Sequence, residues 1–284
     1  MKREEMKISM LEIGSLIDFR NHPYKVKEDM ELDELTRSIQ REGILTPIVV
    51  RTAVKENYYE IISGHRRRLA ARKAGLTVIP AIIKELSDDE AVLYMVDSNL
   101  SREHILPSEK AFAYKMKLDA MNHQGKKMNR TYGQPELKLV KRKTSRQILA
   151  DESGESERQI QRYVRLTHLI PKILDMVDEE KIALTPAVEL SFLTEEEQYE
   201  LYAVMDLEDV TPSLSQASRL RLKSSQGKLD MDMIYSILGE LKPNQREFIK
   251  INAEVFDGLI PDDFTPKQKT DLIISLVKQW ANNK

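Results

Sequence analysis

The chain has 284 residues, of which 32% are charged and 6% are aromatic, and it contains no cysteine. Disulfides, thiolate zinc sites and cysteine catalysis are therefore excluded. No apolar run approaches the roughly 20 residues that a membrane span needs, and the charged start MKREEMKISM lacks the apolar core of a signal peptide. We therefore expect a cytoplasmic protein without a membrane partner.

The first 121 residues combine short β-rich runs with helical spacing. Residues 8–19 read as an extended stretch and a turn, and the runs 48–50, 58–62 and 78–84 read as strands. Leu32, Leu35 and Ile39 fall at helical spacing before Gly43, and further helices are expected after Ser87 and from Pro107 to about Met121. This mixture predicts an α+β domain over residues 1–121.

The stretch IISGHRRRLAARKAG, from Ile61 to Gly75, joins a strand to a helix that opens with three arginines. The amides at a helix start are unpaired and lie at the positive end of the helix dipole, where acids are usual and cations are unfavourable. A bound polyanion would offset Arg66, Arg67 and Arg68, so the pattern indicates a phosphate site. The alternative is an arginine cluster that pairs with acids elsewhere in the chain.

Residues 122–143 lose the helical periodicity and are basic and rich in Gly and Pro, so we expect a linker there. Residues 122–165 hold eleven basic and five acidic residues, whereas residues 171–210 hold two basic and twelve acidic residues. A basic centre beside an acidic neighbour points to nucleic acid as the partner of the centre.

The segments TSRQILADES and ESERQIQRYVRLTHLI predict two helices that are joined by a turn at Gly154. The second helix carries one apolar face, with Ile160, Tyr163, Val164 and Thr167, and a separate face of arginine and glutamine. This pattern matches a helix-turn-helix, although an ordinary helical hairpin with a polar outer face is an alternative. Arginine and glutamine pair with base edges and also hold phosphates. The candidate DNA-binding residues are Arg146, Gln147, Ser156, Arg158, Gln159, Gln161, Arg162 and Arg165.

The helix-turn-helix is expected to belong to an all-α domain over residues 144–225, followed by a second linker, SSQGKLDM. Residues 231–284 predict a small helical C-terminal domain. Its last helix is expected to begin at Thr265 and Pro266 and carries an apolar stripe of Leu272, Leu276 and Trp280. We expect the stripe to pack in the core of that domain, and a self-association surface is the alternative.

Residues 8–193 resemble the ParB family of partition proteins, which includes centromere-binding clamps and nucleoid-occlusion factors. The motifs that carry the resemblance are LDELTRSIQREGILTPIVV, ISGHRRRLAARKAG, IPAII, SNLSREHILPSEKAFAY and the helix-turn-helix, in that order. The resemblance implies an α+β domain of ParB/sulfiredoxin-like fold before the helical part. The chain resembles the variants of this family that are carried on plasmids and integrative elements of Gram-positive bacteria.

The resemblance also implies a bound CTP with Mg²⁺. The family pattern departs at His65 and Ser98, where the family has Glu, and at Thr46, where it often has Gln; the two lost carboxylates weaken the case for hydrolysis more than the case for binding. His65 could serve as a general base, but we expect it to face solvent. The residues carried over to the nucleotide site are Thr46, Pro47, Ile48, Gly64, His65, Arg66, Arg67, Asn99, Arg102 and Glu103, with Asn99 as a ligand of Mg²⁺.

The function that the resemblance implies is CTP-gated DNA binding for partition or maintenance of a plasmid, mobile element or chromosome. The partners would be a palindromic site on double-stranded DNA, a second copy of the chain and a ParA-type ATPase, at the nucleoid or a plasmid in the cytoplasm. Any enzymatic activity would be at most a slow CTPase. The alternatives are a nucleotide-independent helix-turn-helix regulator and a ParB-like nuclease, for which the region offers Glu103 but no evident carboxylate cluster.

Overall fold

The computed structural model describes residues 7–53, 57–100, 102, 104–131, 143–240, 253–256, 258–261 and 264–282. The chain divides into two compact units, Met1–Gly239 and Glu240–Lys284, which are described separately. Within the described residues, no helix is both long and apolar enough to cross a membrane.

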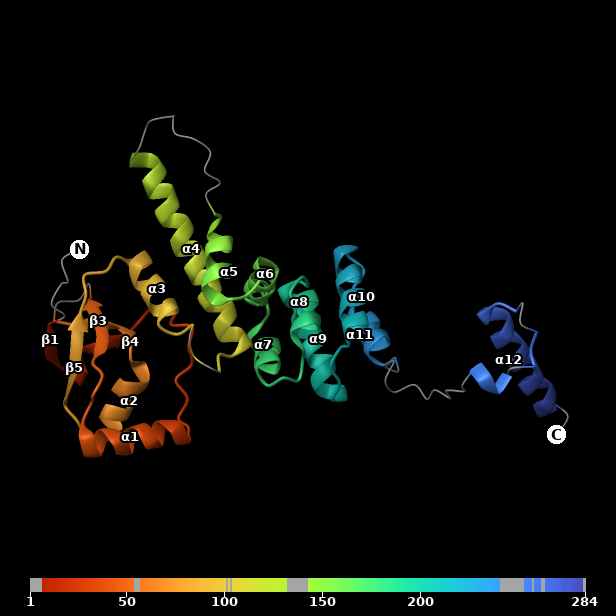
Figure 1. Ribbon diagram of the computed structural model, residues 1–284, viewed down its shortest axis with the longest axis horizontal. Helices are drawn as coiled ribbons and strands as arrows, with labels where there is room; N and C mark the ends of the chain where they lie inside the picture. The colour runs from red at the N-terminus through yellow and green to blue at the C-terminus, as the bar shows by residue number, and fades with distance from the viewer. Residues whose placement is uncertain are drawn as a thin grey trace. The chain divides into compact units, whose positions relative to one another are not determined.

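The N-terminal part of the first unit is built on a mixed five-stranded sheet with the order β1-β5-β3-β4-β2 (Figure 1). β3 and β5 are parallel, as are β2 and β4, and the two other strand pairs are antiparallel. A short 3-10 helix, Ile13–Ser15, separates the first two strands. The strands are β1 (Ile8–Glu12), β2 (Leu16–Asp18), β3 (Ile48–Thr52), β4 (Tyr59–Ser63) and β5 (Val78–Ile83).

Side chains that alternate along the central strands are buried in two separate cores, one on each face of the sheet. Val50 and Ile61 are buried on one face of the sheet beside Ala71 of α2 (His65–Lys73). Their neighbours Val49 and Ile62 are buried on the other face, in the core that includes α3 (Asp88–Asp97). The period of two is that of a strand with both faces covered. α1 (Met30–Glu42) packs against α2, and the predicted α+β fold is confirmed.

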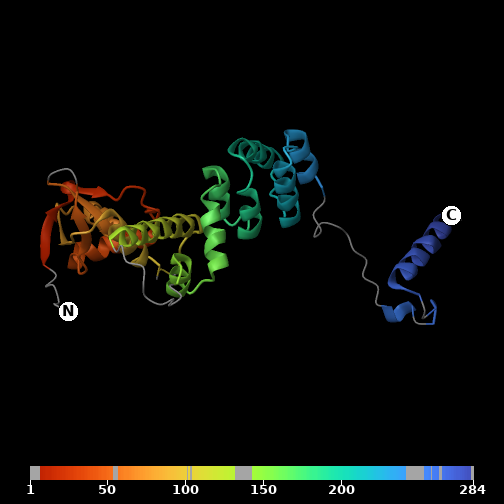
Figure 2. The ribbon, with the colours of Figure 1, turned by 90° about the horizontal axis from the view of Figure 1, so that it is seen from above.

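Helix α4 (Pro107–Thr131) connects the sheet to the remaining helices of this unit (Figure 1, Figure 2). It packs against α3 on one side and against α5, α6 and α7 on the other. The prediction that this helix ends at about Met121 was wrong, since residues 122–131 of the expected linker continue it; residues 132–142 of that linker lie outside the described residues.

The helical part of the first unit has one apolar core to which α6 to α11 all contribute. Side-chain caps fix several helix starts, including capping boxes at Thr144, Thr194 and Ser213. The helices are α5 (Ser145–Ser153), α6 (Glu157–Leu166), α7 (Pro171–Asp178), α8 (Leu184–Leu190), α9 (Glu195–Glu208), α10 (Leu214–Ser225) and α11 (Met231–Leu238).

Helix α11 corrects the predicted start of the C-terminal domain. Ile234, Ile237 and Leu238 are buried in the same core as α9 and α10, so residues 231–239 belong to the first unit. We predicted a separate domain for these residues because the polar turn after α10 resembles a linker. In the structure this turn spans only the few residues between two packed helices. The other predicted domain boundaries stay predictions.

In the second unit, the structure describes a 3-10 helix (Ala253–Phe256) and α12 (Pro266–Asn282). Thr265 precedes α12 and its Oγ1 accepts a hydrogen bond from Gln268 N at 3.4 Å, as expected of a cap. Leu276 is 55% exposed and Trp280 is 62% exposed. The predicted burial of the α12 stripe in a core is therefore not found in the described part of this unit.

Candidate nucleotide turn and helix-turn-helix

The turn between β4 and α2 can be made only by glycine. Gly64 has a φ of 109°, in the left-handed region, and a Cβ at this position would lie 2.6 Å from Ile48 Cγ2. Gly64 is also the N-cap of α2 and supplies no capping side chain, and the first turn of α2 contains no acid. The amides that open α2 are therefore left without a capping side chain or a nearby carboxylate of their own helix.

Arg66 is held by the start of helix α1. Its guanidinium donates to both carboxylate oxygens of Asp29, at 2.8 and 3.1 Å, and to Glu31 Oε2 at 3.3 Å. Asp29 is at the same time the N-cap of α1, where it accepts a hydrogen bond from Leu32 N at 2.9 Å. The hydrogen bonds from Arg66 lower the pKa of the Asp29 carboxyl. In this structure Arg66 thus takes the alternative role of an arginine paired with acids.

Arg67 brings the nucleotide-site segment at the start of β3 to the turn. Its Nη1 donates to the carbonyl oxygens of Thr46, at 2.8 Å, and Pro47, at 2.6 Å. Burial lowers the pKa of the Arg67 guanidinium. The structure therefore places Thr46, Pro47 and Ile48 beside Gly64 and Arg67, although they are distant in the sequence.

His65 is buried, so the expectation that it faces solvent was wrong. Its ring packs on that of His22, with centroids 3.9 Å apart, and burial lowers its pKa to about 3. Asp18 Oδ1 lies 3.8 Å from Nε2, which is longer than a hydrogen bond, and this carboxylate pairs with Arg68 instead. His65 is therefore a neutral residue with an unpartnered Nε2, and a group of such low pKa is a weak general base.

Asn99 lies directly after α3 and is buried. Its Nδ2 donates to Met95 O at 2.7 Å and to Ser98 Oγ at 3.4 Å, so the side-chain oxygen is the atom that remains for a ligand. Glu103, which was also assigned to the nucleotide site, lies outside the described residues. Within the described part of the chain, no group of three or more His, Asp or Glu side chains is placed to hold a metal ion.

Arg66 and Arg102 line one cavity of about 470 Å³ in the first unit. The Arg102 guanidinium lies 5.5 Å from the centre of the Tyr24 ring. The cavity is lined by five basic and six acidic residues. Because carboxylates repel a polyanion, a polyanion enters only if some of them break their ion pairs and leave the basic side chains free to bind it. The basic residues are Lys25, Lys27, Arg66, Arg102 and Lys110, and the acidic ones are Asp29, Glu31, Glu109, Glu155, Asp178 and Glu180.

The predicted helix-turn-helix is formed by α5, a turn and α6. Gly154 makes the turn with a φ of 70°, which is a left-handed conformation. Ser156 caps α6, where its Oγ accepts from Gln159 N at 3.1 Å. Leu149 of α5 and Ile160 of α6 are fully buried in one small core with Tyr114 of α4, which fixes the two helices against α4.

The candidate DNA-binding side chains fall into two groups. Arg146, Arg158 and Gln161 are exposed on α5 and α6. The others make contacts within the chain: Gln147 closes the capping box of α5, Arg162 donates to Gln159 and Thr185, and Arg165 donates to Ser191. Only the first group is free of such recorded side-chain contacts in the described residues.

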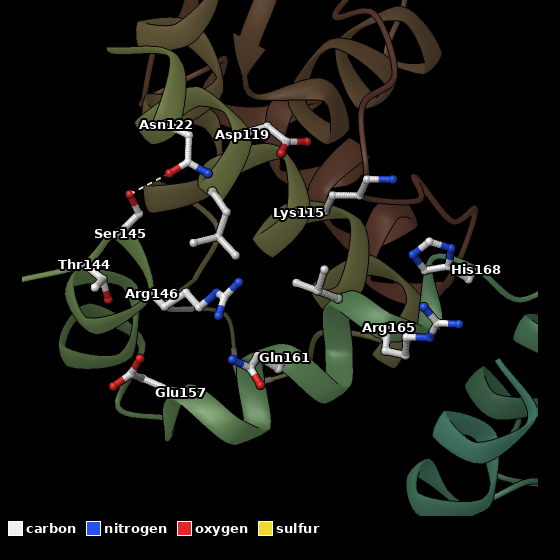
Figure 3. Close-up of a pocket in the computed structure, with 12 residues that line it drawn as sticks. Lys115, Asp119, Asn122, Thr144, Ser145, Arg146, Glu157, Gln161, Arg165 and His168 are labelled. Atoms are coloured by element: carbon white, nitrogen blue, oxygen red, sulfur yellow. Dashed lines mark hydrogen bonds between the residues drawn. The ribbon is translucent and has the colours of Figure 1, made fainter. Parts of the chain in front are cut away.

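A cleft of about 540 Å³ lies between α4, the start of α5 and α6 (Figure 3). Three of the candidate DNA-binding residues, Arg146, Gln161 and Arg165, line it, and so do Lys115 of α4 and His168 after α6. Sequence reasoning missed these two, because the helical spacing of α4 does not say which of its faces borders α6. The sequence did contain a signal for them, because the helix before the hairpin and the segment after it each carry a basic residue, Lys115 and His168.

Comparisons with known proteins agree with this architecture. Residues 1–100 match the ParB N-terminal domain. The nucleoid occlusion protein of Bacillus cytotoxicus is 39% identical over 121 residues, which are 43% of this chain and 41% of that protein. That of Listeria innocua serovar 6a is 33% identical over 176 residues, 62% of this chain and 54% of that protein. The chain thus spans about half the length of the curated relatives that it matches.

Two solved structures of ParB from Caulobacter crescentus, both C-terminally truncated, are also similar. The one complexed to the centromeric parS site is 20% identical, with a TM-score of 0.42, over 76% of this chain and 99% of that chain. The one complexed with CTP-gamma-S is 21% identical, with a TM-score of 0.33, over 69% of this chain and 97% of that chain.

The first third of the chain is thus a ParB N-terminal domain, followed by helices. The matches support the ParB/Noc-like family of partition proteins that the motifs of the chain predict.

Proposed function

We propose that this protein binds CTP at the arginine turn and a palindromic DNA site at the helix-turn-helix, and that it serves partition or maintenance of a chromosome, plasmid or mobile element. It acts as a homodimer that nucleotide closes into a clamp on DNA, and a ParA-type ATPase is its partner in segregation. The observation that carries the nucleotide part is the convergence of Arg66 and Arg102, from two separate motifs, on one cavity.

At the nucleotide site, the arginines act as phosphate ligands. Arg66 exchanges the Asp29 and Glu31 carboxylates for phosphate oxygens, which offer the same bidentate geometry with more charge. Arg102, which also lines the cavity, is the second phosphate ligand. Arg67 holds the Thr46–Pro47 backbone against the Gly64 turn, so its contribution includes shaping the site.

The site offers Mg²⁺ few protein ligands. The ion takes few protein ligands when phosphates are present and completes its shell with water. The side-chain oxygen of Asn99 supplies one hard donor, since its amide nitrogen is already used. When bound, the ion would neutralise phosphate charge. His65, neutral and packed against the His22 ring, is a poor proton acceptor, so any CTP hydrolysis is slow.

At the DNA site, α6 is the recognition helix. Arg158 and Gln161 are exposed and are the base-reading candidates, and Arg146, at the start of α5, lines the same cleft as Gln161. Gln147, Gln159, Arg162 and Ser156 hold the hairpin through their contacts and can offer their remaining hydrogen-bond donors to phosphates.

The test is a thermal-shift titration of the full chain with CTP, ATP, GTP and UTP, each with Mg²⁺. A ligand that binds only the folded state adds about 2.7 kcal/mol at a hundredfold excess over its Kd. CTP alone should raise the Tm, and Arg66→Ala should abolish the shift. Lys73→Ala is the matched control, because Lys73 also lies on α2 and pairs with Glu28 at 2.6 Å. No shift with any nucleotide, with or without DNA, would refute the nucleotide part.

One observation favours a second function, a helix-turn-helix regulator that needs no nucleotide. Arg66 and Arg67 already have acceptors inside the chain, so their positions do not require a polyanion. Such a regulator would bind DNA equally with and without CTP, and Arg66→Ala would leave its DNA affinity unchanged. A CTP-dependent change in binding to a closed DNA circle excludes it.

A further inference from the structure

Phe192, in the loop after α8, packs against two arginines. The Cζ of Arg165 lies 3.9 Å from the centre of its ring and that of Arg221, on α10, lies 3.6 Å from it. The ring and the two guanidinium groups form the Arg165–Phe192–Arg221 stack. Both contacts are within the range of cation–π interactions.

This stack carries an excess of positive charge. Arg221 pairs with Glu189 at 3.1 Å, whereas the recorded acceptors of Arg165 are neutral, Ser191 Oγ at 3.0 Å and Ser191 O at 2.6 Å. Among the described residues, one carboxylate, that of Glu189, therefore pairs with the two positively charged guanidinium groups. Burial and the repulsion of Arg221 lower the pKa of Arg165, which means that its charge is incompletely compensated.

The stack is also accessible and rigid. Phe192 is 40% exposed and the Arg221 side chain is 42% exposed. The ring and the Ser191 and Glu189 acceptors hold both guanidinium planes in place before any ligand arrives. A planar guanidinium that is already oriented loses less conformational entropy when it binds a phosphate.

The stack adjoins the candidate DNA surface. Arg165 belongs to the last turn of α6 and lines the same cleft as Arg146 and Gln161 (Figure 3). Arg221 reaches it from α10, which packs against α8. Of the three residues of the stack, Arg165 lines the cleft, so the stack lies beside the end of the cleft at the last turn of α6.

We propose that the Arg165–Phe192–Arg221 stack binds a backbone phosphate of double-stranded DNA beside the segment that α6 contacts. The inference rests on the proposed DNA binding and changes the role of Arg165 from reading a base to holding the backbone. A phosphate contact sets register and affinity and carries no sequence information, whereas a base contact carries specificity. Arg221, outside the helix-turn-helix, thereby becomes part of the DNA surface.

The experiment measures binding of the full chain to a fluorescent mixed-sequence DNA duplex while the salt concentration is varied. Loss of one phosphate contact should reduce the slope of log K against log salt by about 0.9. Arg221→Gln should show this reduction and bind more weakly, and Phe192→Leu should change binding in the same direction. Glu189→Gln, which removes the competing carboxylate, should bind more tightly than the unmodified chain.

Lys172→Gln is the matched control, because Lys172 also lies over an aromatic ring, 5.3 Å from the centre of Tyr202, but this ring is not the one that Arg165 contacts. An unchanged slope in Arg221→Gln, with Glu189→Gln no tighter, overturns the stack as a phosphate site. The opposite signs expected for these two variants separate a binding effect from misfolding. If the unmodified chain does not bind the duplex, the proposed DNA binding fails, and this inference fails with it.

Discussion

Asp29 and a nucleotide phosphate would compete for the same guanidinium, that of Arg66. Asp29→Asn keeps the N-cap of α1, since asparagine caps as well as aspartate, but removes the competing charge. We expect CTP affinity to rise about two- to fivefold, the range set by a partly exposed ion pair. Isothermal titration of both proteins measures it. Glu28→Gln, which breaks the neighbouring pair with Lys73, should leave affinity unchanged, and equal affinities for all three proteins would contradict the competition.

His65 predicts a pH dependence of stability. Its pKa in the folded protein is about 3, below the usual 6.5, so the unfolded chain binds the proton more readily. Stability is then complete above about pH 6.5 and is lost as the pH falls toward the folded pKa. Between pH 6.5 and 5 the loss should be about 2 kcal/mol of unfolding free energy.

Urea unfolding at several pH values tests this dependence. His65→Gln should flatten the curve whatever its stability at neutral pH, because the substituted side chain does not titrate. His104→Gln is the control, since His104 is exposed. A His65→Gln curve as steep as that of the unmodified chain would show that another group, such as the neighbouring His22, causes the loss.

At the scale of elements, sequence patterns predicted the features that depend on residues close together in the chain. The Gly64 turn, the α5–α6 hairpin and the cap at Thr265 were visible because glycine, capping residues and apolar spacing act within a few residues. The extension of α4 to Thr131 was missed because that segment has no apolar stripe, although its lysines, methionine and arginine are good helix formers. The pairing of Arg66 with Asp29 was out of reach because it depends on how α1 packs against α2.

Lys117 ties three helices together in a way that can be tested. It is buried on α4 and donates to Asp97, at the end of α3, and to Glu152 of α5, the latter at 2.5 Å. Burial alone would lower its pKa, but the two carboxylates outweigh it and the net pKa is raised. Lys117→Met keeps the apolar stem and removes two charge-assisted hydrogen bonds, so unfolding free energy should fall by about 1–3 kcal/mol.

Urea denaturation would show this loss as a lower midpoint with an unchanged slope. Lys143→Met is the control: Lys143 pairs with Asp151 at 2.6 Å, but both side chains are more than half exposed, and such pairs contribute little. Equal midpoints for the two variants would mean that Lys117 does not join the helices.

At the scale of the whole first unit, both candidate sites contact the same connecting helix. Ser108, at the start of α4, donates through N at 2.9 Å and through Oγ at 2.6 Å to Asp178 of α7. Lys25, from the loop before α1, reaches the same carboxylate at 3.3 Å and borders the cavity of Arg66. Lys115 of the same helix lines the cleft beside α6. A nucleotide that displaces carboxylates in the cavity therefore acts on a helix that also borders the DNA surface.

This arrangement predicts coupling that is reciprocal. If CTP changes DNA affinity by some factor, DNA must change CTP affinity by the same factor, because binding free energies around a cycle sum to zero. We expect a factor of about 5 to 150, the usual range of such coupling. Ser108→Ala removes the hydrogen bond from Ser108 Oγ to Asp178, and Ser108 lines neither site. The substitution should therefore reduce the coupling factor, while the affinity for each ligand in the absence of the other stays nearly unchanged. Titrating each ligand with the other absent and saturating measures both factors. A factor of one in the unmodified chain would leave two independent sites and support the nucleotide-independent regulator.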